Sequence, residues 1–264
     1  MIPAPSERTV VDHPKLTQAP INEVVVGFVF EPVVGLTPVL HGLYWDRRRA
    51  DFPAHEVHPA ITDVPTIWEG AAPQRTWLIS KNETQLVQIQ NDRFFVNWRK
   101  RGADDAYPRF TTRDGVPGLL DYALGEYDRF AAFCAEHGIE LRLAAVELTK
   151  IDLLLQGQHW SDLKDLGSLL PMTRPLAELS DGPSAEVALK FAETGEDTLT
   201  FVTVGSGMER QTQTRVIRLE TRTRQNRVER TKLEATFKGL NDRVNSLFFR
   251  FVPREQLYRF GGTA

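Results

Sequence analysis

The chain has 264 residues, of which 41% are hydrophobic and 25% are charged, and its formal net charge is -3. This composition is typical of a globular protein, and the length allows one large domain or two small ones, each with its own hydrophobic core. The net charge argues against a protein that coats nucleic acid with its whole surface. Residues 205–264 nevertheless hold 13 Lys and Arg against 6 Asp and Glu, so a basic patch on a more acidic body is possible.

The absence of apolar segments and the single cysteine restrict the class of protein further. No apolar run approaches the roughly 18 residues that a membrane helix needs, which predicts no membrane partner. The first residues, MIPAPSERTVVDHPKL, lack the apolar core of a signal peptide, so we expect a cytoplasmic protein. Cys134 is the single cysteine, which excludes an intramolecular disulfide and a cysteine-based metal site.

The first half of the chain alternates strand and helix patterns after a polar, proline-rich lead-in. Residues 1–18 have no periodicity and predict a flexible tail. Thr37 followed by Pro38 is typical of a helix N-terminus. In chain order, the predicted elements are a strand at 20–32, a helix at 35–53, a long excursion at 51–75, a strand at 77–80, a hairpin at 85–90 and 93–99, and a long helix at 117–137.

The second half repeats this order of elements. Ser161 is the predicted cap of its first helix, and apolar residues recur at helical spacing between Leu233 and Phe251. In chain order, the predicted elements are a strand at 141–155, a short helix at 160–170, strands at 185–192, 198–204 and 211–225, and a long helix at 231–251.

This repetition predicts an α+β fold made by tandem duplication of a β-α-β-β-β-α unit. The first unit spans residues 19–140 and the second spans 141–264. Each antiparallel sheet is expected to carry its long helix on one face. The order of elements resembles the topology of TATA-binding-protein-like folds, and the two units form either separate sheets or one continuous sheet.

The hairpin separates two kinds of side chain. Asn91 and Asp92 suit a two-residue turn, which pairs Gln90 with Arg93 and places alternate residues on opposite faces. One face is wholly apolar and is the predicted core: Val87, Ile89, Phe94, Val96 and Trp98. The other face is the predicted binding surface, and it holds Gln88, Gln90, Arg93, Phe95, Asn97 and Arg99. Arg109, which returns after Tyr107-Pro108, is expected to extend it.

Amides, guanidinium groups and an exposed aromatic ring on a sheet are typical of proteins that bind single-stranded RNA or DNA. The same groups suit a polar protein partner, or a solvated face with one incidental Phe95. The strand at 211–225 places Arg218, Arg222 and Arg224 on one side. This row is expected to bind phosphate or an acidic protein, or else to protect an edge strand from aggregation.

The sequence contains no motif for catalysis, a cofactor or a metal. His55-Glu56-Val57-His58 is one residue short of the helical zinc motif and lies among prolines, so its imidazoles cannot share a helical face. Lys150 and Asp152 alternate onto one side of a strand and predict a polar groove or an interface.

Three segments carry a resemblance to a known family. They are APINEVVVGFVF (residues 19–30), LVQIQNDRFFVNWRK (86–100) and YPRF (107–110), and they resemble sporadically distributed bacterial and archaeal proteins of about this length. The resemblance extends over nearly the whole chain, including the C-terminal LFFRFVPREQLYRFG. Many members share a Tyr-Ile-Asn segment in the strand after the middle helix, where this chain reads VELTKID. The family has no known activity, and its distribution implies a role in defence or on mobile elements.

Together these features predict a non-enzymatic binding protein. Its polar hairpin face and basic strand are expected to contact nucleic acid or a protein partner, without a cofactor. One alternative is an enzyme that processes phosphate compounds at the arginine strand. Another is a homo-oligomer, such as a homodimer, that uses these faces against itself.

Overall fold

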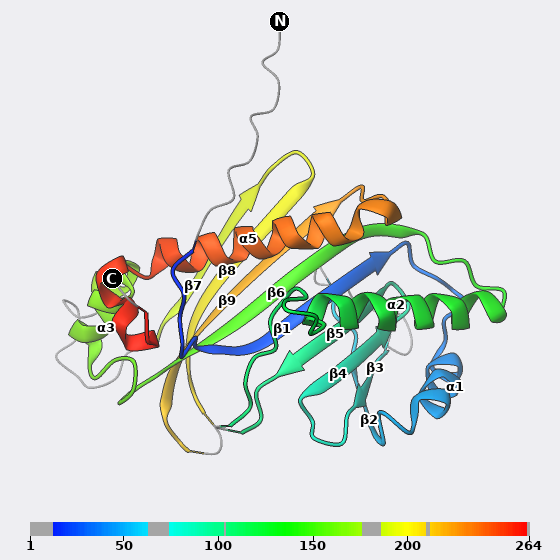
Figure 1. Ribbon diagram of the computed structural model, residues 1–264, viewed down its shortest axis with the longest axis horizontal. Helices are drawn as coiled ribbons and strands as arrows, with labels where there is room; N and C mark the ends of the chain where they lie inside the picture. Colours follow the sequence, from blue (N-terminus) through cyan, green and yellow to red (C-terminus); the bar gives the residue numbers. More distant parts are fainter. Residues whose placement is uncertain (1–12, 63–73, 103, 176–185, 210–211, 263–264) are drawn as a thin grey trace, which may run out of the picture.

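A computed structural model describes residues 13–62, 74–102, 104–175, 186–209 and 212–262. Its strands form one antiparallel sheet in the order β2-β3-β4-β5-β1-β6-β9-β8-β7 (Figure 1). The strands of the first half are β1 (Ile21–Phe30), β2 (Ala54–Pro59), β3 (Gln74–Ile79), β4 (Gln85–Gln90) and β5 (Arg93–Arg99). Those of the second half are β6 (Leu143–Leu155), β7 (Ala188–Thr194), β8 (Thr198–Met208) and β9 (Arg215–Asn226).

The helices connect and cover these strands. The α-helices are α1 (Pro38–Arg48), α2 (Leu119–Glu136), α3 (Leu163–Leu169) and α5 (Leu233–Phe251). Short 3-10 helices are η1 (Pro171–Thr173), η2 (Arg230–Lys232) and η3 (Arg254–Phe260). No described helix is both long and apolar enough to cross a membrane.

The two halves of the chain meet at the centre of the sheet, where β1 pairs with β6. The prediction of an α+β fold with antiparallel strands is confirmed, and the halves share one continuous sheet. α2 and α5 lie side by side on one face, which we call the helix face (Figure 1). We call the opposite face the back face.

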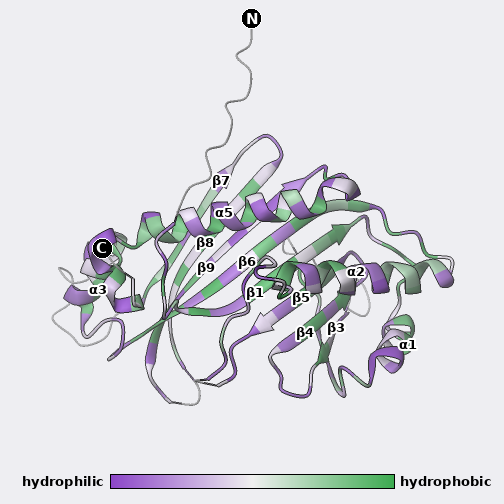
Figure 2. Ribbon diagram, viewed as in Figure 1, coloured by the Kyte–Doolittle hydropathy of each residue, from purple (hydrophilic) through white to green (hydrophobic). Residues whose placement is uncertain are grey.

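The main core lies between the sheet and these two helices. Phe28 in β1 stacks on Tyr127 of α2 with ring centroids 4.0 Å apart, and it meets Phe237 of α5 edge-on at 5.4 Å. Figure 2 shows hydrophobic and hydrophilic residues alternating along the strands and helices, as one-sided burial requires. The packing of one ring against both helices joins the two halves of the chain.

Three predicted elements differ from the structure. The excursion expected at 51–75 contains strand β2, which pairs with β3 and adds one strand to the first half. β2 is an exposed edge strand, so its sequence AHEVHP does not alternate between apolar and polar residues. The sequence therefore carries no strand pattern at this place. The N-cap of α3 is Asp162 and not Ser161, because the Asp162 carboxylate accepts a hydrogen bond from Asp165 N at 2.9 Å. α1 ends at Arg48, five residues before the predicted end at Pro53.

The predicted N-terminal tail lies partly outside the described residues, which begin at residue 13. The described part of the tail is attached to the C-terminal segment. Gln18 N donates to Phe260 O at 2.9 Å, and Leu16 forms a β-bridge with Gly262. The His13 ring stacks on Phe249 at 5.2 Å. These contacts join residues 13–18 to the C-terminal segment.

Candidate functional site

The β4–β5 hairpin has the predicted register. Gln90 lies opposite Arg93, Gln88 opposite Phe95 and Leu86 opposite Asn97. The predicted apolar face is confirmed as part of the main core under α2. The six predicted binding residues of the hairpin therefore point to the back face of the sheet.

β9 contributes to the same face from the other half of the chain. Leu219, Thr221 and Thr223 are buried towards the helices, so Arg218, Arg222 and Arg224 point to the back. β9 lies between β6 and β8, and the edges of the sheet are β2 and β7. The interpretation of the arginine row as a guard on an edge strand is therefore wrong.

Arg109 does not join this face. The segment that carries it lies on the helix side, where Tyr107 packs edge-on against Trp98 at 5.3 Å and Phe110 is part of the core. The Arg109 guanidinium is 3.6 Å from the Asp114 carboxylate. Of the predicted binding residues, only Arg109 is separated from the others.

Most hairpin side chains on the back face are buried in a hydrogen-bond network. The alternating sequence pattern instead predicts that these side chains form an exposed surface. Gln88 Nε2 donates to Asn97 Oδ1 at 2.9 Å, and Asn97 Nδ2 donates to Glu23 Oε1 at 2.5 Å. Gln90 binds the backbone N and O of Ile61, at 2.8 and 2.9 Å. Burial raises the pKa of Glu23, although the Asn97 hydrogen bond opposes this shift.

Phe95 is not an exposed ring, because it covers a glycine on the neighbouring strand. Gly27 lies opposite Phe95, and a Cβ atom at residue 27 would be 2.6 Å from Phe95 Cε1 and 2.9 Å from Glu147 Cγ. Ile61 also packs against this group, and Phe95 is only 3% exposed. Phe95 is therefore a packing residue and offers no stacking surface.

We expect Gly27→Ala to lower the free energy of unfolding by about 1–3 kcal/mol, because the new methyl group overpacks the site under Phe95. Urea denaturation measures the change. Gly205→Ala in β8 is the matched control, since the nearest atom to its new Cβ is 3.8 Å away, and we expect a change within about 0.5 kcal/mol. Equal midpoints for the two variants would contradict the role of Phe95.

The structure adds aromatic residues that the sequence did not single out. Trp77 of β3 lies on the back face, with Arg75 Cζ 5.2 Å and Arg99 Cζ 5.6 Å from its ring. In the second half, Phe201 of β8 has Arg222 Cζ at 4.9 Å and Lys190 Nζ at 5.3 Å. The sequence predicts a short strand at 77–80 but does not indicate which strand pairs with it. The side of the sheet on which Trp77 lies therefore could not be predicted.

Cations outnumber anions on the back face of the described strands. The basic residues there are Arg75, Arg93, Arg99, Lys190, Arg218, Arg222 and Arg224. The acidic residues are Glu23, Glu56, Glu147 and Glu220. This excess runs across both halves of the sheet and favours a negatively charged partner.

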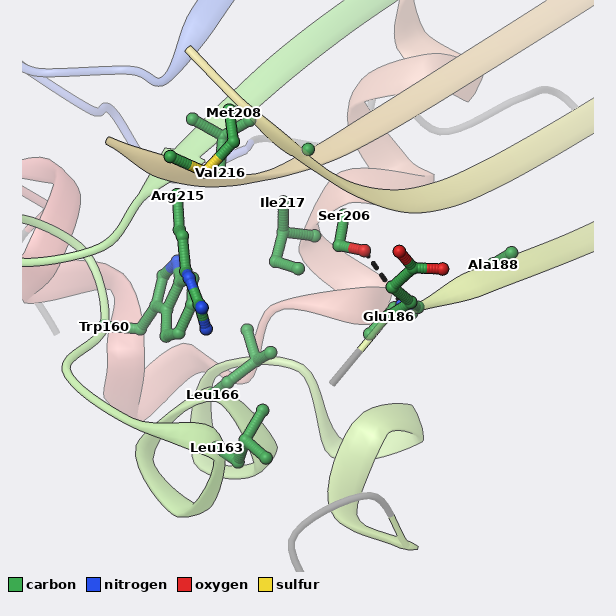
Figure 3. A pocket seen from close by; sticks show the side chains of 12 residues that line it. Trp160, Leu163, Leu166, Glu186, Ala188, Ser206, Met208, Arg215, Val216 and Ile217 are labelled. Atoms are coloured by element: carbon green, nitrogen blue, oxygen red, sulfur yellow. Dashed lines mark hydrogen bonds between the residues drawn. The ribbon is translucent and has the colours of Figure 1, made fainter. Parts of the chain in front are cut away.

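A cavity of about 570 Å³ lies elsewhere, between α3 and the ends of β7, β8 and β9 (Figure 3). Trp160, Leu166 and Ile217 form much of its wall, and Ser206 Oγ accepts a hydrogen bond from Val187 N at 2.9 Å. No described lining residue has a buried polar side-chain atom without a partner. The back face has several such atoms, among them Trp77 Nε1 and Gln88 Oε1, so it is the better candidate for a polar ligand.

Lys150 and Asp152 lie on the helix face and not on the back face, which confirms that they share one side of their strand. Lys150 Nζ donates to Asn245 Oδ1 of α5 at 2.6 Å. Burial lowers the pKa of Lys150, and it raises the pKa of Asp152. The pair belongs to the sheet–helix interface.

The described residues contain no group of three or more His, Cys, Asp or Glu side chains placed to hold a metal ion. His55 and His58 lie on β2, where the odd spacing puts them on opposite faces. Comparison of the chain with known protein families, with curated proteins and with solved structures found no match.

Proposed function

We propose that this protein is a non-enzymatic binding protein that takes a single-stranded nucleic acid across the back face of its sheet. The observation that carries this proposal is the pairing of aromatic rings with cations at Trp77 and at Phe201. The Phe201 ring offers a platform for a base and guanidinium groups offer partners for phosphates, which is how sheet proteins hold single strands. The Trp77 ring already packs against His58, with ring centroids 3.9 Å apart, so at that end the cations supply the contacts.

The spacing of the two ring sites suits an extended strand. Trp77 is on β3 and Phe201 is on β8, and five strands lie between them in the sheet. At the usual spacing of neighbouring strands, the two sites are roughly 29 Å apart along the sheet. A single strand of several nucleotides covers that distance, and it passes the arginines of β9 on the way.

The sheet order is consistent with a duplicated saddle, and we include this in the proposal. From the central pair outwards, the first half runs β1, β5, β4, β3 and the second runs β6, β9, β8, β7. β2 continues the first half and has no counterpart in the second. In this view, which follows the topology of TATA-binding-protein-like folds, both units contribute the same face to one extended ligand.

Fluorescence anisotropy with a labelled oligonucleotide of about 12 nucleotides tests the proposal. We expect binding that weakens with salt, with a logarithmic slope of about -0.7 for each phosphate contacted. The double variant Lys190→Ala with Arg222→Ala should bind about tenfold more weakly and with a shallower slope. Arg109→Ala is the control, because Arg109 lies on the helix side.

Two results would contradict the proposal. One is the absence of salt-dependent binding by any single-stranded DNA or RNA. The other is an equal loss of affinity in Arg109→Ala and in the double variant. Stable binding of an acidic protein without binding of oligonucleotides would assign the same face to a protein partner.

A further inference from the structure

Arg75 makes no direct ion pair with a described residue, although the negative charge of Glu23 lies near it. Its side chain is partly buried, and none of its nitrogens takes part in a hydrogen bond or ion pair there. Burial lowers the pKa of Arg75, and the nearby positive charge of Arg93 lowers it further, while the negative charge of Glu23 opposes this shift. A partly desolvated guanidinium beside another cation is unfavourable unless an anion joins it.

The neighbours of Arg75 also have single polar atoms without a partner. Trp77 Nε1 and Arg99 Nε are buried donors without an acceptor, and Gln88 Oε1 is a buried acceptor without a donor. Buried polar atoms without partners are rare in native proteins, and several in one place indicate a missing ligand. We call Arg75, Trp77 and Arg99 the Trp77 cluster.

The acidic residues near the cluster have other partners. Glu23 accepts from Asn97, Glu56 lies 2.8 Å from His58, and Glu83 pairs with Arg101. Arg99 Nη2 donates to Glu83 O at 3.3 Å, so the cluster keeps the Arg75 guanidinium, Arg99 Nε and the indole N–H for an anion that brings several oxygens. The partly exposed side chains of Arg75, Trp77 and Arg99 leave an approach from solvent.

The cluster lies close to one end of the back face. β3 carries Arg75 and Trp77, and only β2 lies beyond it in the sheet. On the far side of β2 the face offers no further strand, so a nucleic acid that crosses from β9 ends near Trp77. A strand end differs from its interior by a phosphate monoester, which has a second negative charge and a third free oxygen.

We propose that the Trp77 cluster binds the terminal phosphate of a single-stranded nucleic acid, while the indole ring itself stays packed against His58, whose ring centroid is 3.9 Å away. This inference rests on the proposed function. Two guanidinium groups match the charge of a monoester, and Trp77 Nε1 supplies the additional donor for its third oxygen.

The test compares three oligonucleotides of one sequence that carry a 5′-phosphate, a 3′-phosphate or hydroxyl groups at both ends. We expect one of the phosphorylated strands to bind at least tenfold more tightly than the hydroxyl strand, as charge-assisted hydrogen bonds predict. Arg75→Ala should reduce this ratio to about one, while the hydroxyl strand still binds. Trp77→Phe, which keeps a ring and removes the N–H, should reduce the ratio in part.

Arg109→Ala serves as the control and should keep the full ratio. Because Arg75 makes no hydrogen bond or ion pair with a described residue, Arg75→Ala is expected to fold, which a thermal melt verifies. Equal affinities of the wild type for all three strands would overturn the terminal-phosphate site and leave the proposed function intact. Failure of every strand to bind would overturn both. A ratio that survives in Arg75→Ala would also overturn the assignment of the site.

Discussion

We expect Arg48→Met to lower the free energy of unfolding by about 3–5 kcal/mol, because it leaves a buried carboxylate without its main partner. The Arg48 guanidinium of α1 binds both carboxylate oxygens of Glu126 in α2, at 2.8 and 2.9 Å. The Glu126 side chain is only 1% exposed and that of Arg48 is 11% exposed. This pair joins α1 to α2, so its loss also weakens the contact between the helices.

A control and a double variant separate the buried charge from simple loss of an arginine. Arg129 also contacts Glu126, at 2.8 Å, but its side chain is 60% exposed, and Arg129→Ala should cost less than about 1 kcal/mol. Arg48→Met with Glu126→Leu should recover most of the loss, since no charge remains buried. Urea denaturation measures all four proteins. A double variant as unstable as Arg48→Met would contradict this explanation.

Asp152→Leu is the second substitution with a large expected effect, about 1–3 kcal/mol at neutral pH, because it removes a negative charge that supports the buried Lys150 ammonium. It leaves the Lys150 ammonium buried beneath α5 with Asn245 Oδ1 as its hydrogen-bond acceptor. Replacing both charges, by Lys150→Met with Asp152→Leu, should be neutral or stabilising by about 1–4 kcal/mol, because two desolvated groups are removed together. Lys238→Met on α5 is the control, since its pair with Glu234 is exposed.

The same pair predicts how stability depends on pH. Burial raises the pKa of Asp152 from 3.8 to about 7, so the folded state binds the proton more tightly and stability falls as pH rises through this range. Burial lowers the pKa of Lys150 from 10.5 to about 8, so stability rises as pH increases from 8 towards 10.5.

Denaturation of the wild type and of the double variant at pH 4, 7.5 and 10 tests this dependence. The advantage of the double variant should be largest near pH 7.5, between the two shifted pKa values. A constant difference at all three pH values would show that the two groups keep their ordinary pKa values in the folded protein.

The sequence by itself determined the local structure of the hairpin and the order of the elements. The turn at Asn91 and Asp92 and the alternation of apolar residues fix the register, because a shift of one residue would move Phe94 and Val96 out of the main core to the back face. The strand and helix patterns similarly gave the α+β class and the shared side of Lys150 and Asp152. These features depend on neighbours along the chain, so a single sequence contains them.

Only the tertiary structure decided which faces are covered and which strands meet. Phe95 is predicted to be exposed, but its ring covers Gly27 of β1. The strand that carries the β9 arginines is compatible with a sheet edge in the sequence, but β8 pairs beside it in the structure. The sequence does not single out Arg75 and Trp77, because their buried nitrogens without partners result from the pairing of β3, β4 and β5. Each outcome depends on contacts between strands distant in sequence, which alternation within one strand does not specify.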